Sequence, residues 1–204
     1  MIMNTFDFLD NQKLIKQLDF IVEIDKMKSI FRRTVLIDKS RRENDAEHSW
    51  HFAVMAMLLE EYSAEKVDIN KVIKIALIHD LVEIYAGDTF AYDNIGKQNK
   101  EKRELEAADR LFGLLDKEQA GYIRSLWNEF EDKSTPESRY ANVCDRLQPL
   151  IHNYLTDGHT WKEGNVRSFQ VIERMKIIED TAPELWKVVT GIIKKSVEQG
   201  ILLP

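Results

Sequence analysis

The stretch that most constrains how this chain can fold is residues 75–88, IALIHDLVEIYAGD, where polar side chains interrupt an apolar helical run. His79 and Asp80 are neighbours among Ile, Leu and Val, and Glu83 follows one turn later. Burying these groups is costly unless they are paired, protonated or bound to a cation. Neighbouring side chains on a helix diverge by roughly 100°, but Glu83 is three or four residues from both and shares their face. We therefore expect the three to converge, either on a divalent metal ion or as a core histidine beside helix-surface acids.

The composition of the chain favours helices. It has 204 residues, of which 44% are hydrophobic and 31% charged, which is enough for one domain with a substantial core. Only 8 Gly and 4 Pro are present, so the chain is poor in the residues that form turns and end strands. We predict an all-α, single-domain bundle over 1–204 with roughly seven or eight helices. Apolar periodicity places them at about 11–28, 46–62, 70–86, 99–115, 117–131, from 135 onward, 166–179 and 182–198.

Local signals set some of the expected helix boundaries. A polar loop covers roughly 35–44, and Asn44 or Asp45 is expected to cap the helix that follows it. Thr181 and Glu184 have the spacing of a capping box for the last helix.

Charge and cysteine content limit the classes of partner. The net charge of −6 argues against bulk attraction to a nucleic acid polymer, and no apolar run reaches the ~20 residues that cross a bilayer. The single cysteine, Cys144, fits a reducing cytoplasm, and the N-terminal residues lack the pattern of a signal peptide. Basic residues are nevertheless clustered before His48, either as a solvated loop or as a site that captures phosphate: Arg32, Arg33, Lys39, Arg41 and Arg42.

Two further residues are candidate metal ligands. His48 lies near the start of a helix in AEHSWH, and Asp145 interrupts the apolar segment YANVCDRLQPLI. The alternative for Asp145 is an ion pair with Arg146 or Arg139. Other histidines are expected to serve packing or to be exposed, although His51 lies close enough to His48 to be considered as a ligand: His51, His152 and His159.

The order of His, His-Asp and Asp across separate helices carries a resemblance to a known family. The strings RRTVLIDKSRRENDAEHSWH, ALIHDLVEIYAGD and CDRLQP resemble the HD-domain metal-dependent phosphohydrolases, and most closely their 5'-deoxynucleotidases. The resemblance covers about 18–155, and the helices over 160–200 are expected to pack on that part. It implies four ligands of a divalent metal ion: His48, His79, Asp80 and Asp145.

The same resemblance implies roles for further residues. Glu83 and Asp88 match two catalytic acids, and the sequence does not distinguish which is the acid and which the base. Some members of the family use the matching residues to hold a second ion. Arg33, fifteen residues before His48, matches an arginine that contacts substrate. Thr34 follows it, where deoxyribose-selective members can have a bulky aromatic residue, so this chain departs from the pattern that would exclude ribose.

These residues predict a hydrolytic reaction. Two imidazoles and two carboxylates suit Mn²⁺, Co²⁺, Fe²⁺, Ni²⁺ or Zn²⁺, and Mg²⁺ is also compatible. The expected reaction is hydrolysis of (deoxy)nucleoside 5'-monophosphates to nucleoside and phosphate, under a loop at 88–98 that could close over the site. The alternatives are hydrolysis of a cyclic or hyperphosphorylated nucleotide, or a non-catalytic nucleotide- or metal-binding module. The family resemblance and the apolar C-terminal helices also favour a homodimer.

Overall fold

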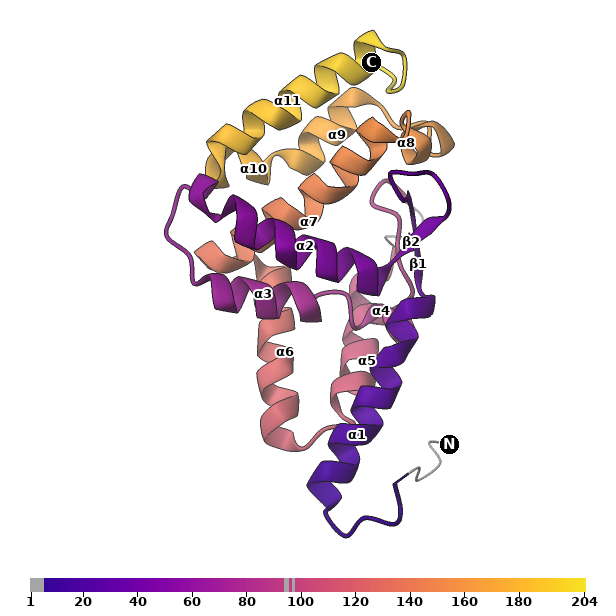
Figure 1. Ribbon diagram of the computed structural model, residues 1–204, viewed down its shortest axis with the longest axis vertical. Coiled ribbons are helices and arrows are strands. Elements are labelled where there is room, and N and C mark those ends of the chain that lie inside the picture. Colours follow the sequence, from indigo (N-terminus) through magenta and orange to yellow (C-terminus); the bar gives the residue numbers. More distant parts are fainter. Residues whose placement is uncertain (1–5, 94–95, 97) are drawn as a thin grey trace.

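The computed structural model describes residues 6–93, 96 and 98–204, and these residues form a set of helices with one short hairpin at its edge (Figure 1). The all-α prediction is therefore confirmed, and eight helices in the described part of the chain have eight residues or more. The helices are α1 (Gln12–Ile24), α2 (Asp45–Leu59), α3 (Ile69–Ile78), α4 (Glu83–Ala86), α5 (Lys100–Phe112), α6 (Lys117–Asp132), α7 (Pro136–Leu155), α8 (His159–Glu163), α9 (Ser168–Met175), α10 (Ile177–Thr181) and α11 (Pro183–Glu198). Two 3₁₀ turns, η1 (Asp25–Ser29) and η2 (Glu60–Tyr62), and two strands, β1 (Phe31–Val35) and β2 (Arg42–Asn44), complete the elements.

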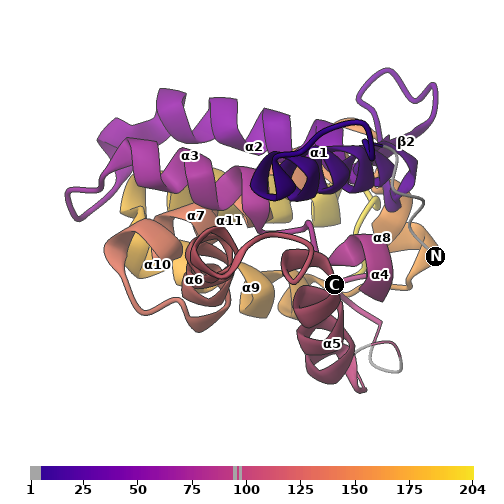
Figure 2. The same ribbon diagram turned by 90° about the horizontal axis from the view of Figure 1, so that it is seen from below.

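Helix α7 is the central element. It packs against α2, α3, α6, α8, α9, α10 and α11 and also against β1. Seen from below, α2 and α3 form one layer over α7, while α5 extends away from it (Figure 2). The middle turns of α7 are buried on nearly all sides, and they include the polar residues Asp145 and Gln148.

The buried apolar residues form two clusters. The larger one surrounds α7 and includes Phe52, Ile75 and Tyr140, whereas the smaller one joins η1 to α5 and α6 through Met27 and Leu111. Each fully buried side chain of this kind contributes about 1.5–3 kcal/mol. Residues 79–82 connect α3, which belongs to the larger cluster, to a segment that packs in the smaller one.

The predicted helix over 70–86 is wrong in one respect, because it breaks after Ile78. Backbone N–H groups of Leu81 and Glu83 donate to the carbonyls of Ile78 and Asp80, three residues back, in place of the four-residue α-helical spacing. Glu83 then begins the one-turn helix α4. In this turn Nε2 of His79 lies 3.0 Å from Oδ2 of Asp80, so the two neighbouring side chains reach the same point.

The hairpin β1–β2 was not predicted. Its strands pair antiparallel, with Phe31 opposite Asn44 and Val35 opposite Arg42, and they bracket the turn within the expected polar loop. Asn44 caps α2: its side chain accepts from the N–H of Glu47, whose carboxylate accepts from the N–H of Asn44. Asp45 is therefore the first helical residue, and its side chain does not cap the helix.

The C-terminal part differs from the predicted helices in its divisions. The segment 166–179 is divided between α9 and α10, and a one-turn helix, α8, occupies a segment expected to be a loop. Thr181 ends α10 and does not cap α11, which starts at Pro183 with Ala182 at the cap position and no side-chain cap bond. No helix among the described residues has the length and apolar character needed to cross a membrane.

Candidate metal centre and active site

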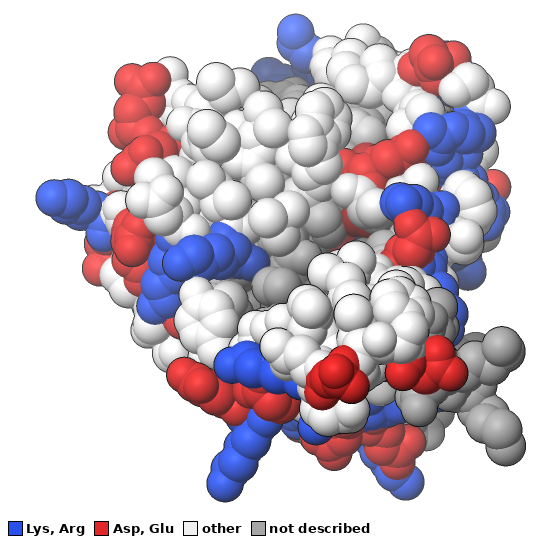
Figure 3. All heavy atoms as spheres, turned by 60° about the horizontal axis from the view of Figure 1, so that its bottom comes forward, with Lys and Arg blue, Asp and Glu red and all other residues white. Residues whose placement is uncertain are grey.

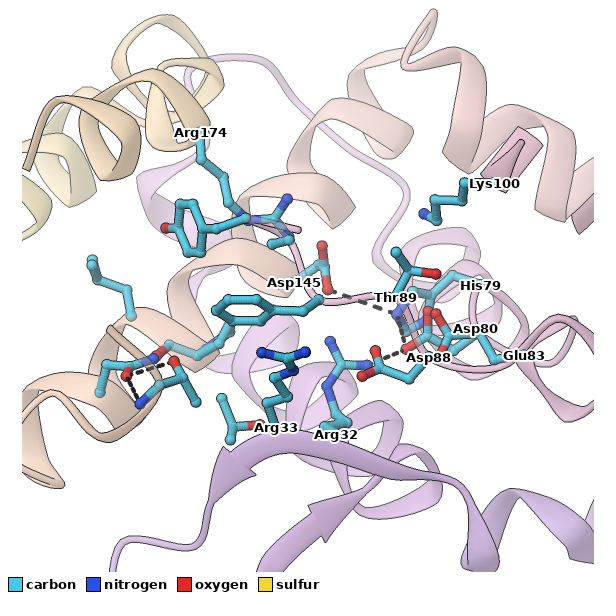
Figure 4. Close-up of a pocket in the computed structure, with 18 of the residues that line it drawn as sticks. Arg32, Arg33, His79, Asp80, Glu83, Asp88, Thr89, Lys100, Asp145 and Arg174 are labelled. Carbon is cyan, nitrogen blue, oxygen red and sulfur yellow. Dashed lines mark hydrogen bonds and ion pairs between the residues drawn. The ribbon is translucent and has the colours of Figure 1, made fainter. Parts of the chain in front are cut away.

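Three elements bring together the four predicted ligands. His48 comes from α2, His79 and Asp80 from the turn after α3, and Asp145 from the middle of α7. The Nε2 atom of His48 lies 3.1 Å from Oδ1 of Asp145 and 3.8 Å from Oδ2 of Asp80. The Nε2 atom of His79 lies 3.0 Å from Oδ2 of Asp80 and 3.8 Å from Oδ1 of Asp145 (Figure 4). Two imidazoles and two carboxylates therefore converge on one point.

Hydrogen bonds behind the rings determine which ring nitrogens carry protons. The Nδ1 atom of His79 lies 2.8 Å from the carbonyl oxygen of Ala76, and Nδ1 of His48 lies 3.2 Å from Oε1 of Gln148. Both partners are acceptors, so each Nδ1 must be the donor and each neutral ring has its lone pair on Nε2.

A cation fits the resulting set of atoms. With neutral imidazoles, two Nε2 lone pairs and two carboxylates are acceptors that face one another, and of these groups Asp80 also accepts from Nη1 of Arg32 at 2.7 Å. The Nε2 atom of His79 is indeed buried without a hydrogen-bond partner. In the metal-free protein burial opposes ionisation, but the charge of protonated His79, and then that of Arg32, lowers the pKa of Asp80, and protonated His48 and His79 hold the pKa of Asp145 well below its usual range. A metal ion would take the place of the Nε2 protons, because a ligating imidazole must be neutral. Two ionised carboxylates beside two imidazole lone pairs form a good donor set for a divalent transition metal.

Gln148 and Glu43 position His48 from behind. The amide group of Gln148 donates to Oε1 of Glu43 and also lies 3.3 Å from Nδ1 of His51 and from Nε2 of His152. Because the carboxylate of Glu43 can only accept, the amide nitrogen of Gln148 faces it and the amide oxygen faces His48. Glu43, His51 and His152 also resemble a metal site in their spacing, but the amide nitrogen of Gln148 already contacts all three.

The role of Gln148 can be tested by metal affinity. In Gln148→Leu, the Nδ1–H of His48 loses its acceptor, so the ring can adopt the other tautomer and donate from Nε2 to Asp145. We expect the affinity for Mn²⁺ or Co²⁺ to fall by roughly 10- to 100-fold, the usual effect of removing such a supporting group. A chelator-competition titration measures this loss, and His51→Ala, which removes an acceptor on the far side of the amide, serves as a control that retains affinity. Unchanged affinity in Gln148→Leu would exclude the role.

A second acidic cluster lies beside the four ligands. Oxygen atoms of Asp45, Glu83 and Asp88 lie within 4.8 Å of one another. Burial, and then the charge of Asp80, raise the pKa of Asp45 to about 7 and hold the pKa of Glu83 well above its ordinary value. Burial also raises the pKa of Asp88. At pH values where exposed carboxylates are already ionised, this cluster therefore still holds protons on Glu83 and, in part, on Asp45.

The raised pKa of Asp45 predicts a pH-dependent effect on stability. The folded, metal-free protein binds the Asp45 proton more tightly than the unfolded chain does, since the pKa rises from 3.8 to about 7. The contribution of Asp45 is thus most favourable at low pH and is lost as pH rises through that window. We expect Asp45→Asn, which cannot ionise, to be more stable than the unsubstituted protein at pH 8, on the order of 2–4 kcal/mol.

Urea unfolding in the presence of a chelator measures this difference. The increase in the free energy of unfolding of Asp45→Asn should be less than half as large at pH 5 as at pH 8, because most of the Asp45 carboxyl is protonated in the folded state at pH 5. Asp10→Asn, at an exposed position, is the control and should show no such pH dependence. A gain of equal size at both pH values would contradict the assignment.

A pocket of about 150 Å³ opens over both clusters. Arg33 lies in its wall with its guanidinium 4.6 Å from the ring centre of Phe90, and no described carboxylate forms an ion pair with it. Thr34 also lines the pocket, but its hydroxyl donates to Oε2 of Glu43 at 3.3 Å. Lys100 and Arg174 enter from the opposite side (Figure 4). The pocket thus combines acidic groups at its base with cationic and aromatic groups around its rim.

The remaining predicted candidates lie elsewhere. Asp145 pairs with neither arginine, because Arg139 binds Glu65 and the Arg146 guanidinium donates to the carbonyl of Arg174. His159 is half-exposed and lies 3.4 Å from Glu163.

Comparison with known proteins places the chain in a family. The model of the HD domain family matches residues 24–186. A solved structure from Magnetospirillum magnetotacticum, described as a predicted metal-dependent phosphohydrolase, has 47% identity and a TM-score of 0.91, covering 99% of this chain and 100% of that one. The 5'-deoxynucleotidase HDDC2 of Danio rerio is 32% identical over 129 residues, which is 63% of each chain, so the match spans less than two thirds of that relative. The human protein of that name is 27% identical over 153 residues, or 74% of each. Since the family model spans well over half of its length, this chain belongs to the HD domain family.

Proposed function

We propose that this protein is a metal-dependent phosphohydrolase that converts nucleoside 5'-monophosphates, with deoxyribose or ribose, to nucleoside and phosphate. The observation that carries the proposal is the convergence of two imidazole nitrogens and two carboxylates beneath a pocket that Arg33 lines without an ion-pair partner among the described residues. The similarity to proteins described as 5'-deoxynucleotidases and to a predicted phosphohydrolase supports the same class of reaction.

The proposed ligands of the ion are His48, His79, Asp80 and Asp145. An ion held there would supply a Lewis acid beside the phosphoryl group and increase the acidity of water. In the hydrolysis, a water oxygen forms a bond to phosphorus while the bond from phosphorus to the 5'-oxygen breaks. One proton leaves the water and one joins the departing oxygen.

Glu83 and Asp88 are suited to the two proton transfers. Glu83 is buried to 5% exposure and its pKa is raised well above the ordinary range, whereas Asp88 is half-buried and faces the pocket. We assign the protonated Glu83 to the departing oxygen and the more accessible Asp88 to the water, because two acids with different environments can hold different protonation states.

Arg33 is proposed to bind the phosphate. Its guanidinium is stacked on Phe90 and has no carboxylate partner among the described residues, so its planar fork of donors is available to phosphoryl oxygens. Thr34 presents a small side chain toward the pocket, and we therefore expect no strong selection between ribose and deoxyribose.

The surface supports a small-molecule substrate. On the face shown in Figure 3, Lys and Arg side chains are interspersed with Asp and Glu, and no continuous basic surface is visible among the described residues. A nucleic acid polymer would require a broader positive surface to bind its backbone.

Phosphate release from a panel of ribo- and deoxyribonucleoside 5'-monophosphates tests the proposal. The protein should be loaded with Mn²⁺ or Co²⁺, and cyclic and hyperphosphorylated nucleotides should be included as comparison substrates. We expect turnover of 5'-monophosphates of both sugars. Turnover of only the comparison substrates, or metal binding with no turnover at all, would contradict the proposed function.

A further inference from the structure

Arg32 lies among four carboxylates next to the proposed metal ligands. Its Nη1 atom is 2.7 Å from Oδ2 of Asp80 and 3.3 Å from Oδ1 of Asp45, and only 14% of its side chain is exposed. Burial alone would disfavour its charge, but Asp80, Asp88, Glu83 and Asp45 all act on it, and its pKa is raised well above the usual value. Arg32 is thus a fixed, buried cation within the second acidic cluster.

Asp80 is shared between this cation and the metal ligands. Its Oδ2 atom lies 3.0 Å from Nε2 of His79 and also 2.7 Å from Nη1 of Arg32. In two-metal sites, the two ions lie ≈ 3.5–4 Å apart and clamp the reacting group together. Here the second positive group at the shared carboxylate is a guanidinium nitrogen.

The second acidic cluster has the donors that a second hard cation would use. The oxygens of Asp45, Glu83 and Asp88 are mutually close enough to bind one ion. Arg32 contacts one of these residues directly, so an additional divalent ion there would lie next to a guanidinium that cannot lose its charge.

The neighbouring arginine shows that this placement is specific. Arg33 follows Arg32 on β1 and also lines the pocket, yet it stacks on Phe90 and binds no described carboxylate. Figure 4 shows both guanidinium groups rising from the strand, with Arg32 on the side of Asp88 and Glu83.

We propose that the guanidinium of Arg32 occupies the position of a second cation, so that each chain binds one divalent metal ion at His48, His79, Asp80 and Asp145. Asp45 helps to hold Arg32 in this position, and Arg32 in turn orients Asp80 toward the imidazoles. This inference rests on the proposed metal centre and is independent of which phosphate ester is the substrate.

The number of bound Mn²⁺ ions tests the proposal directly. We expect one ion per unsubstituted chain at saturating Mn²⁺, measured by titration and metal analysis, with the electron paramagnetic resonance spectrum of an isolated ion. In Arg32→Met, the cluster of Asp45, Glu83 and Asp88 should accept a second ion, giving two per chain and a spectrum of two coupled ions. Arg33→Met removes a neighbouring cation from the same strand and should retain one.

Two outcomes would overturn the inference. Two ions in the unsubstituted chain would show that Arg32 does not take the place of an ion, whether or not any variant folds. A folded Arg32→Met protein that still binds one Mn²⁺ ion per chain would show that Arg32 does not limit the number of bound ions. If Arg32→Met fails to fold, the milder Arg32→Gln variant provides the same test, and Arg32→Lys should keep a single ion. Because these readouts need no turnover, they distinguish failure of this inference from failure of the proposed substrate.

Discussion

Asp145→Asn is expected to lose the metal ion and at least roughly a thousandfold in turnover, since a bound ion supplies several kcal/mol of transition-state stabilisation. The substitution keeps the shape of the side chain, which lies in the middle of α7 with Oδ1 3.1 Å from Nε2 of His48. It removes one of the two negative charges of the donor set and leaves an amide beside the two imidazoles. Metal content after gel filtration and initial rates of phosphate release measure the two effects.

Asp109→Asn is the matched control for this substitution. Asp109 is exposed on α5, where its carboxylate lies 2.8 Å from Nη1 of Arg124. Exposed pairs of this kind contribute about 0–1 kcal/mol, so metal content and rate should remain unchanged. Full metal content in Asp145→Asn, together with full activity, would remove Asp145 from the metal centre.

Glu83→Gln is expected to keep the metal ion and lose roughly 10²- to 10⁴-fold in turnover, the range that a positioned acid or base contributes. The amide cannot transfer a proton to the departing oxygen, but it occupies nearly the same volume in the buried cluster with Asp45 and Asp88. The rate and the metal content should therefore separate in this variant, in contrast to Asp145→Asn.

Glu131→Gln provides the comparison, because Glu131 lies in the wall of the same pocket without joining the acidic cluster. We expect it to change turnover by no more than about twofold, because Glu131 is neither one of the proposed ligands nor one of the two proposed proton-transfer residues. If Glu83→Gln also lost the ion, Glu83 would be a ligand and not a proton donor.

The helical fold could be predicted from the apolar periodicity, and the set of four ligands from the resemblance, because His79, Asp80 and Asp145 interrupt apolar helical segments and His48 lies in the matching string AEHSWH. A buried carboxylate such as Asp145 is conspicuous in YANVCDRLQPLI, where its unpaired charge would be costly. Glu43 and Gln148 do not stand out in the same way. Glu43 lies among polar residues, and Gln148 is directly followed by Pro149. Their role depends on the contact between β2 and α7, which are a hundred residues apart in the chain.

Other features could not be read from periodicity. The apolar pattern of residues 70–86 continues through the break at His79, because the segments on both sides of the break are buried. Arg32 and Arg33 are chemically equivalent in the sequence, and only the strand that carries them distinguishes the buried guanidinium from the stacked one. Asp45 looks like a helix cap, but Asn44 takes that position and leaves Asp45 for the cluster.

The location of the break between α3 and α4 has a consequence for how the molecule unfolds. This four-residue connection is one of the segments that join the two apolar clusters, and it carries two of the proposed ligands. An ion bound there would hold this connection against α2 and α7, because it would also bind His48 and Asp145. Loading with metal should therefore make the loss of the two clusters a single concerted event, and stripping the ion should allow the smaller cluster to loosen first.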